Sequence, residues 1–360
     1  MLIGMVSPYD LGVPGGVQGQ VRGLAIEMTR RGHEVIVVSP GGAADDPLVE
    51  TGVRHIPAGA TAKISANGSK APLTLSLRAA RATALAFERS GVEVVHLHEP
   101  LTPVEGWAVL RRHRAPIVGT FHRSGVDGLY RGAGLVLRGL IKSIDVAVAV
   151  SPAAAQTARS TCGLDPQVLF NGIDVEAYRT ARPWPKENPT ALFLGRDEKR
   201  KGRQVLLDAA RLLDPSVTIW ATGDPPPTES SDSGAKIHYL GQVSEAEKRE
   251  RLAAADVLCA PSLGGESFGL VLLEGLAAGA VVVASDIDGY REALNGHGFL
   301  VRPDDPEALA IGIRSALDQG RGGTLASKNH VEKWSMAALA DRYELIYRDA
   351  QRIGQVWSRR

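Results

Sequence analysis

Short runs of β-branched and aliphatic residues alternate with helical stretches along almost all of the 360 residues. Continuous apolar runs of this kind are typical of strands that are covered on both faces of a sheet. When such strands alternate with helices, they form open parallel sheets with helices on both sides. The alternation therefore predicts an α/β fold of the doubly wound type.

The alternation runs through two successive blocks, which predicts two domains. Strands of the first block are expected at 2–7, 34–39, 53–56, 92–97, 117–121, 146–150 and 167–170, with helices such as 17–31 and 74–90 between them. Strands of the second block are expected at 191–194, 217–221, 237–240, 257–260, 281–285 and 299–301. A turn signal at Asn171-Gly172 and a proline-rich segment at 182–189 separate the blocks. We therefore expect domains at 1–170 and 171–339, with a surface loop at 225–234.

Composition limits the partners and the compartment. Apolar residues make up 44% of the chain and charged residues 22%, which suits ordinary globular domains. The formal net charge of +1 gives no global attraction to nucleic acid. The two cysteines, Cys162 and Cys259, do not indicate a disulfide framework, and neither a signal peptide nor a membrane-spanning apolar run is recognisable. A cytoplasmic protein is expected.

The segment 262–274 combines a strand end, a glycine turn and the start of a helix. It turns at Gly264-Gly265 and enters a helix that is expected over about 268–278. The free N–H groups and the positive dipole at a helix start suit a phosphate, and glycine allows a ligand to approach closely. Glu266 and Glu274 flank this start, and carboxylates accept hydrogen bonds from the hydroxyls of a sugar or ribose. An ordinary amphipathic helix behind a polar loop is the alternative interpretation.

Two further loops lie directly after expected strands. Pro14-Gly-Gly-Val-Gln18 permits close approach to a pyrophosphate, but it is not the Gly-x-Gly-x-x-Gly fingerprint of nicotinamide-binding sheets. Arg196 and Lys201 follow the first strand of the second block, where their charges would stabilise an anionic group without a metal. A solvated charged loop is the alternative, and Glu198 and Arg200 are expected to orient that loop.

Histidines end two strands of the first block. His122 is a candidate site residue, although a lone histidine at a strand end is more often structural. His96 and His98 lie on the same side of a strand, but a third convergent metal ligand is missing unless Glu99 supplies it. Asp286-Ile-Asp288 is interpreted as a carboxylate pair in a loop. No metal site is therefore expected.

The pair Glu266 and Glu274, with seven residues between them and the words Gly-Gly-Glu-Ser-Phe-Gly around the first, resembles the E-x7-E motif of the retaining family-4 glycosyltransferases. The resemblance covers nearly the whole chain. It implies the GT-B architecture, in which two Rossmann-like domains face each other across a cleft and share one site. It also implies that the last helix, about 336–351, crosses back and that 340–360 packs on the first domain. The apolar stripe of that helix is Leu339, Tyr343, Ile346 and Tyr347.

The resemblance assigns roles to individual residues. Glu266 would contact the transferred sugar, Glu274 would hold the nucleotide ribose, and His122 would help to position the sugar. The catalytic set is then His122, Arg196, Lys201 and Glu266. The donor would be bound by Gly15, Gly16, Arg196, Lys201, Val243, Lys248, Glu266, Ser267, Phe268, Gly269, Leu270, Val271 and Glu274. The acceptor would be bound by Tyr9, Gln18, Asn67 and Lys70.

Within that family, the chain is most similar to the actinobacterial phosphatidylinositol mannosyltransferases, which use GDP-mannose and share Gly-Gly-Val-Gln at 15–18. It departs from them on the acceptor side. Lys70 follows Asn67-Gly-Ser where those enzymes carry an arginine for the inositol phosphate, and Leu101 replaces an asparagine. Their basic helix face for anionic lipid is reduced to Arg78, Arg81 and Arg89, which are worth about 1 kcal/mol per charge at a membrane surface. Only weak binding to an anionic membrane is therefore expected.

Three functions are compatible with these residues. The first is mannosyl transfer from GDP-mannose to phosphatidylinositol at the inner face of the cell membrane. The second is transfer from another UDP- or GDP-linked sugar to a soluble or secondary-metabolite acceptor. The third is nucleotide-sugar binding without turnover, against which the intact set of motif residues speaks. The nucleotide sugar would be a substrate, no cofactor is expected, and the sequence leaves the sugar epimer and the oligomeric state open.

Overall fold

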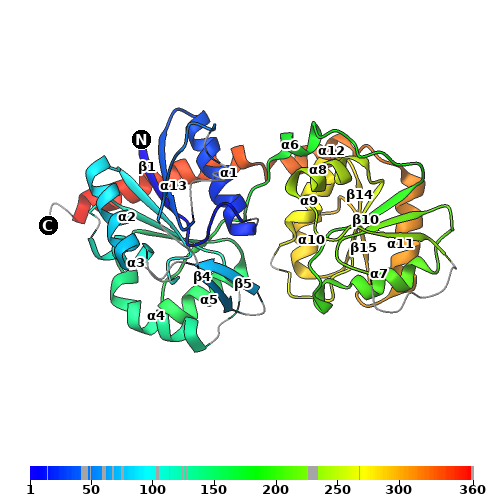
Figure 1. The fold of residues 1–360 in the computed structure, drawn as a ribbon, viewed down its shortest axis with the longest axis horizontal. Helices are drawn as coiled ribbons and strands as arrows, with labels where there is room; N and C mark the ends of the chain where they lie inside the picture. The colour runs from blue at the N-terminus through cyan, green and yellow to red at the C-terminus, as the bar shows by residue number, and fades with distance from the viewer. Residues whose placement is uncertain are drawn as a thin grey trace. The chain divides into compact units, whose positions relative to one another are not determined.

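The computed structural model describes residues 1–13, 15–41, 48, 50–58, 62–66, 69–73, 77–102, 105–112, 114–123, 125, 128–225, 234–266 and 268–357. The chain divides into two compact units (Figure 1). The first unit comprises Met1–Gly172 and Met336–Arg360, and the second comprises Ile173–Ser335. The crossover from the first unit to the second therefore falls at the Asn171-Gly172 turn signal.

The first unit is built on a parallel sheet of seven strands in the order β3-β2-β1-β6-β7-β8-β9. These strands are β1 (Leu2–Val6), β2 (Glu34–Ser39), β3 (Arg54–Pro57), β6 (Val94–His98), β7 (Ile117–Phe121), β8 (Val146–Ala149) and β9 (Gln167–Val168). The helices of the unit are α1 (Gly16–Arg30), α2 (Leu77–Ser90), α3 (Glu105–Arg112), α4 (Gly128–Ile141), α5 (Pro152–Cys162) and α13 (Met336–Trp357).

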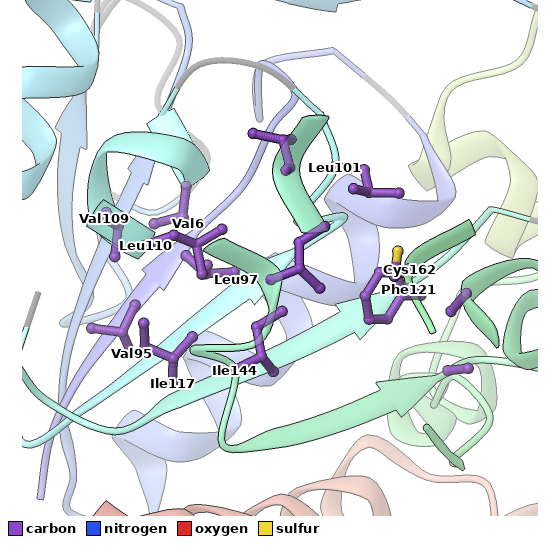
Figure 2. Packing of buried hydrophobic residues seen from close by; sticks show 14 of the residues in the cluster. Val6, Val95, Leu97, Leu101, Val109, Leu110, Ile117, Phe121, Ile144 and Cys162 are labelled. Carbon is purple, nitrogen blue, oxygen red and sulfur yellow. The ribbon is translucent and has the colours of Figure 1, made fainter. Parts of the chain in front are cut away.

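Central strands of this sheet such as β1 are buried on both faces, which explains why β1 is a continuous apolar run, whereas the edge strand β9 is exposed. Successive residues of a strand point to opposite faces, so Val35 and Val37 join one core cluster while Ile36 and Val38 join the other. One cluster lies between the sheet and helices such as α3, whose Val109 and Leu110 pack over β-strand side chains (Figure 2). The other contains α1 together with the stripe of α13. Its members from α13 include Leu339, Tyr343, Ile346 and Tyr347.

The second unit repeats the architecture with a parallel sheet of six strands in the order β12-β11-β10-β13-β14-β15. The strands are β10 (Thr190–Phe193), β11 (Thr218–Ala221), β12 (Lys236–Tyr239), β13 (Val257–Ala260), β14 (Val281–Ser285) and β15 (Phe299–Val301). Its helices are α6 (Val175–Arg179), the short 3₁₀ helix η1 (Lys199–Lys201), α7 (Arg203–Ala210), α8 (Glu245–Ala254), α9 (Leu270–Ala277), α10 (Asp288–Leu294), α11 (Pro306–Gln319) and α12 (Leu325–Glu332).

The predicted strands are present within a few residues of their expected bounds, but two local features differ. An antiparallel hairpin of β4 (Ala62–Ala66) and β5 (Ser69–Leu73) was not predicted. Helix α9 begins at Leu270 and not near residue 268, because Gly269 has a φ of +102° and therefore precedes the helix. Most of the loop expected at 225–234 lies outside the described residues. Over the part of the chain that the structure describes, no helix combines the length and apolarity that a membrane crossing needs.

Candidate functional site

Two loops of the second unit meet at the carboxyl edge of its sheet, where ligands of such sheets bind. The loop 194–202 follows β10 and the loop 261–269 follows β13, and these two strands are hydrogen-bonded neighbours. The loops are also joined directly, because the N–H of Leu263 donates to the carbonyl oxygen of Arg200 at 2.7 Å. The sheet register therefore brings the cationic loop and the E-x7-E loop together.

A glycine makes this contact between the loops possible. Gly202 has a φ of +70°, and a Cβ atom at this position would lie 1.8 Å from the carbonyl oxygen of Pro261. A side chain would thus push the loops apart in addition to straining the backbone. The close approach places η1 directly against the segment that carries Glu266.

Glu266 is the centre of a compact ion cluster. Its carboxylate lies 2.8 Å from Nζ of Lys201 and 2.7 Å from a guanidinium nitrogen of Arg200. Ser262 donates a longer hydrogen bond of 3.4 Å to the same oxygen. The Glu266 side chain is only 12% exposed, so these charges interact more strongly than a surface pair would. The predicted residues Lys201 and Glu266 are therefore in direct contact.

Arg196 and Arg200 make different contacts within this loop. Arg196 is 62% exposed and pairs with Glu198 at 3.0 Å, so its guanidinium remains accessible to a ligand. Arg200 was expected to orient its loop, and in the structure it bridges Glu198 of that loop and Glu266 of the neighbouring loop. The position of Arg200 directly before Lys201 was a sequence signal for a site role. Its contact with Glu266, however, depends on the pairing of β10 with β13, which the sequence does not reveal.

Glu274 is held by a second set of contacts on the inner side of α9. Nζ of Lys248 lies 3.1 Å from Glu274 and 2.9 Å from Glu245. Burial is the largest single influence on the pKa of Lys248 and lowers it, but the charge of Glu274 together with the contributions of Tyr178 and Glu245 raises the pKa above its ordinary value. The buried Tyr178 of α6 hydrogen-bonds with Lys248 and Glu274, and burial followed by the Glu274 charge raises the pKa of its hydroxyl. Sequence analysis missed Tyr178 because it lies far from both partners along the chain.

The remaining predicted donor-side residues of the second unit lie at the starts of α8 and α9. Val243 is half-buried directly before the N-cap of α8, and Leu270 and Val271 are half-buried in the first turn of α9. Phe268 is buried against the ring of Trp334, with ring centroids 4.6 Å apart. A Cβ on Gly269 would meet the ring of Tyr290 at 2.7 Å. Ser267 lies outside the described residues.

In the first unit, the glycine loop stands at the start of α1. Gly15 precedes the helix and Gly16 is its first residue. The buried Gln18 fills the space beside Gly15, since a Cβ there would lie 2.3 Å from its Oε1 atom. Among the predicted acceptor residues, Tyr9 is half-buried, and burial followed by the charge of Glu99 raises its pKa to about 12. Lys70 contributes its backbone to β5, and Asn67 lies outside the described residues.

The backbone at His122 is held by hydrogen bonds to the carboxylate of Glu99. This buried carboxylate accepts hydrogen bonds from the backbone N–H groups of His122 and Arg123 at 2.9 and 3.0 Å, and from the hydroxyl of Tyr130. Burial raises the pKa of Glu99. Glu99 itself has a φ of +51°, a strained conformation for this residue type that is common at functional sites. Glu99 therefore binds the backbone of His122 and also contributes to the raised pKa of Tyr9.

The other candidate metal ligands have protein partners. His96 hydrogen-bonds to Tyr347 at 2.9 Å and to Thr120 at 2.7 Å, and His98 bonds to His122 at 3.0 Å. Asp286 and Asp288 both pair with Arg291. No group of three potential metal-ligating side chains occurs among the described residues.

We expect the histidine cluster to make the first unit less stable in acid. Burial lowers the pKa of His96 to about 3, of His122 to about 4 and of His98 well below its usual value. Below about pH 6.5 the histidines of the unfolded chain are protonated, whereas those of the native state stay neutral. The unfolded chain therefore binds more protons, and the free energy of unfolding rises with pH between about pH 5 and 7.5. For each histidine that stays neutral in the native state, the free energy of unfolding falls by about 2 kcal/mol as the pH is lowered from 7.5 to 5. Glu99 has the opposite effect, because its raised pKa means that protonation at low pH stabilises the native state. It is a single group, however, whereas three histidines lower the free energy of unfolding in acid.

Denaturant unfolding at several pH values would measure the slope. The variant His96→Gln should reduce it by about one histidine's contribution. The exposed His238 provides the control, since His238→Gln removes a histidine that lies outside the cluster, on β12 of the second unit. A stability that is constant from pH 7.5 to 5 would contradict the expectation that the cluster is neutral.

Comparison with known proteins gives consistent results. A model described as "Glycosyltransferase Family 4" matches residues 14–177, and one described as "Glycosyl transferases group 1" matches 188–319. The phosphatidyl-myo-inositol mannosyltransferase of Mycolicibacterium smegmatis is 36% identical over 98% of this chain and 95% of its own. The protein of the same name from Mycobacterium tuberculosis is 38% identical over 96% of each chain. A glycosyltransferase structure from Rickettsia africae has a TM-score of 0.72 at 21% identity, covering 97% of this chain and 98% of its own.

Proposed function

Because this chain belongs to glycosyltransferase family 4, we propose that it is a retaining enzyme that transfers mannose from GDP-mannose to phosphatidylinositol. The observation that carries the proposal is the pairing of each E-x7-E carboxylate with a lysine at one sheet edge. Glu266 contacts Lys201, and Glu274 contacts Lys248. The two anionic groups are thereby oriented before any ligand arrives, which reduces the reorganisation that binding requires.

On the donor side, the second unit supplies complementary charges and hydrogen-bond acceptors. Arg196 and Lys201 stabilise the diphosphate as it departs, because a guanidinium and an ammonium lower the energy of a developing anion. Glu266 accepts hydrogen bonds from the sugar hydroxyls, and Glu274 accepts them from the ribose. In the first unit, the open start of α1 at Gly15 and Gly16 offers backbone N–H groups to a phosphate.

The acceptor assignment rests on the names of the similar proteins and on the first unit. Tyr9, Gln18 and Lys70 are the residues that we propose for the inositol headgroup. Arg81 and Arg89 of α2 are exposed and would attract anionic lipid weakly, at about 1 kcal/mol per charge. The enzyme would then act at the inner face of the cell membrane as a peripheral protein.

A transfer assay with chosen donors and acceptors tests this function. The purified protein would be incubated with GDP-mannose and vesicles that contain phosphatidylinositol, and the lipids would be analysed by mass spectrometry. We expect one added hexose on phosphatidylinositol and a much lower yield with UDP-glucose. Transfer to a soluble inositol phosphate but not to the lipid would contradict the proposal that phosphatidylinositol is the acceptor. Tight binding of GDP-mannose without transfer to either acceptor would contradict enzymatic activity.

We further propose that the reaction requires no divalent metal. The cationic side chains of Arg196 and Lys201 supply the charge that a metal ion would otherwise place on the leaving diphosphate. The expected result is that turnover is unchanged when a chelator such as EDTA is present throughout the assay. Activity that disappears with the chelator and returns with Mg²⁺ or Mn²⁺ would contradict the proposal.

A further inference from the structure

The buried imidazole of His98 and the half-buried imidazole of His122 form a hydrogen-bonded pair at the carboxyl ends of adjacent strands. His98 is the last residue of β6, and His122 directly follows β7. Nδ1 of His98 lies 3.0 Å from Nε2 of His122, and the two rings stack with centroids 5.3 Å apart. The separation fits a hydrogen bond, so one of these two nitrogens carries a proton and the other accepts it.

Both rings are held neutral by their surroundings. Burial lowers the pKa of His122 to about 4 and that of His98 well below its usual value. His96 adds a third neutral ring, with its centroid 4.1 Å from that of His98. The nearby charged groups are Glu99, which binds the backbone N–H of His122, and Arg123. Because both rings are neutral, each carries one N–H proton. The hydrogen bond can therefore run in only two directions, from His98 to His122 or from His122 to His98.

The unpaired atom of His98 distinguishes the two arrangements. Within the described part of the chain, Nε2 of His98 is buried and has no hydrogen-bond partner. If His122 donated to His98, the proton of His98 would lie on Nε2 as a buried N–H without an acceptor, which is a rare and costly state. If His98 donates from Nδ1, its Nε2 atom keeps only an unused lone pair. The second arrangement is therefore favoured.

We infer that His98 is a positioning residue that holds His122 in the tautomer protonated at Nδ1. Nε2 of His122 is occupied by accepting from His98, and its Nδ1–H is the donor that remains for a ligand. The role of His122 at the sugar is part of the proposed function, on which the catalytic side of this inference rests. The hydrogen bond from the backbone N–H of His122 to Glu99 fixes the same residue from its other end.

The tautomer can be observed directly, without turnover. Long-range nitrogen–proton NMR spectra of protein labelled with ¹⁵N-histidine distinguish a protonated ring nitrogen from an unprotonated one. We expect Nδ1 protonated and Nε2 unprotonated in His122 of the unmodified protein near neutral pH. The opposite pattern in His122 would overturn the inference even if the protein proves to be an active mannosyltransferase. Absence of sugar transfer, in contrast, would remove the proposed function and leave the tautomer result standing.

Three variants connect the tautomer to the reaction. In His98→Leu the pair is broken, so we expect the Nε2–H form of His122 to appear and kcat to fall about tenfold, the size of one lost neutral hydrogen bond. In His98→Asn the side-chain amide can donate from nearly the place of Nδ1, and both the tautomer and most of kcat should be retained. His96→Asn alters the neighbouring ring but keeps the pair, and it serves as the control. An unchanged His122 tautomer in a folded His98→Leu protein would contradict the positioning role. If that variant does not fold, the spectrum of the unmodified protein decides.

Discussion

Replacing Lys201 with alanine is expected to lower the turnover number about a hundredfold, because a preformed charge at a developing anion contributes roughly 3 kcal/mol to the transition state. Lys201 is only 19% exposed and already lies 2.8 Å from Glu266, so its position is set before the donor binds. The loss should appear in kcat more than in KM, since the charge on the diphosphate grows as the bond to the sugar breaks. Arg196→Ala should act in the same direction.

The neighbouring residue Lys199 provides a matched control for Lys201. It lies in the same short helix η1 but is exposed. Lys199→Ala removes an equal charge within two residues of Lys201 and should leave kcat within a factor of about two, as expected for a surface substitution. Steady-state kinetics and thermal unfolding of both variants would be compared. A Lys201→Ala protein that folds normally and turns over like Lys199→Ala would exclude Lys201 from the reaction.

The sheets could be predicted from the sequence because their cause is local. Strands such as β13 and β14 are covered on both faces, so nearly all of their residues are apolar, with Ser285 at the end of β14 as the exception, and the apolar runs can be recognised in the sequence. The hairpin β4–β5 leaves no such run, since Lys63 and Ser65 interrupt the first strand. Its available signal was the Asn-Gly pair between the strands, which is typical of two-residue hairpin turns.

Contacts within the site depend on register and could be predicted only in part. The E-x7-E spacing identifies Glu266 and Glu274, but nothing in the sequence states that Arg200 reaches Glu266 or that Tyr178 reaches Glu274. The hydrogen bond between His98 and His122 could have been predicted more easily, because both histidines lie at the ends of expected strands that follow each other in the chain. Adjacent parallel strands present their carboxyl ends at one edge. A search for polar residues at successive strand ends would have paired them.

The two cations on Glu266 lead to a prediction about how retention is achieved. A retaining transfer needs either a carboxylate nucleophile or attack from the face of the leaving group. In the second route the acceptor oxygen bonds to the anomeric carbon as the bond to the diphosphate breaks, and the acceptor proton passes to a diphosphate oxygen. Glu266 is engaged by Lys201, Arg200 and Ser262, which stabilise its negative charge and reduce its nucleophilicity. We therefore expect it to hold sugar hydroxyls and not to form a covalent intermediate.

Glu266→Gln tests this role with little change of shape. The amide keeps one oxygen acceptor but loses the charge, so Lys201 and Arg200 are left facing a neutral group. We expect kcat to fall about a hundredfold, comparable with the loss of one preorganised electrostatic contact, and discrimination between mannose and its epimers to weaken. Glu292→Gln on α10 is the control, because Glu292 is exposed. Mass spectrometry of the unmodified enzyme with GDP-mannose alone should show no protein mass increased by one hexose. A hexose attached to Glu266 would establish the nucleophilic route instead, and an inverted product would contradict both routes.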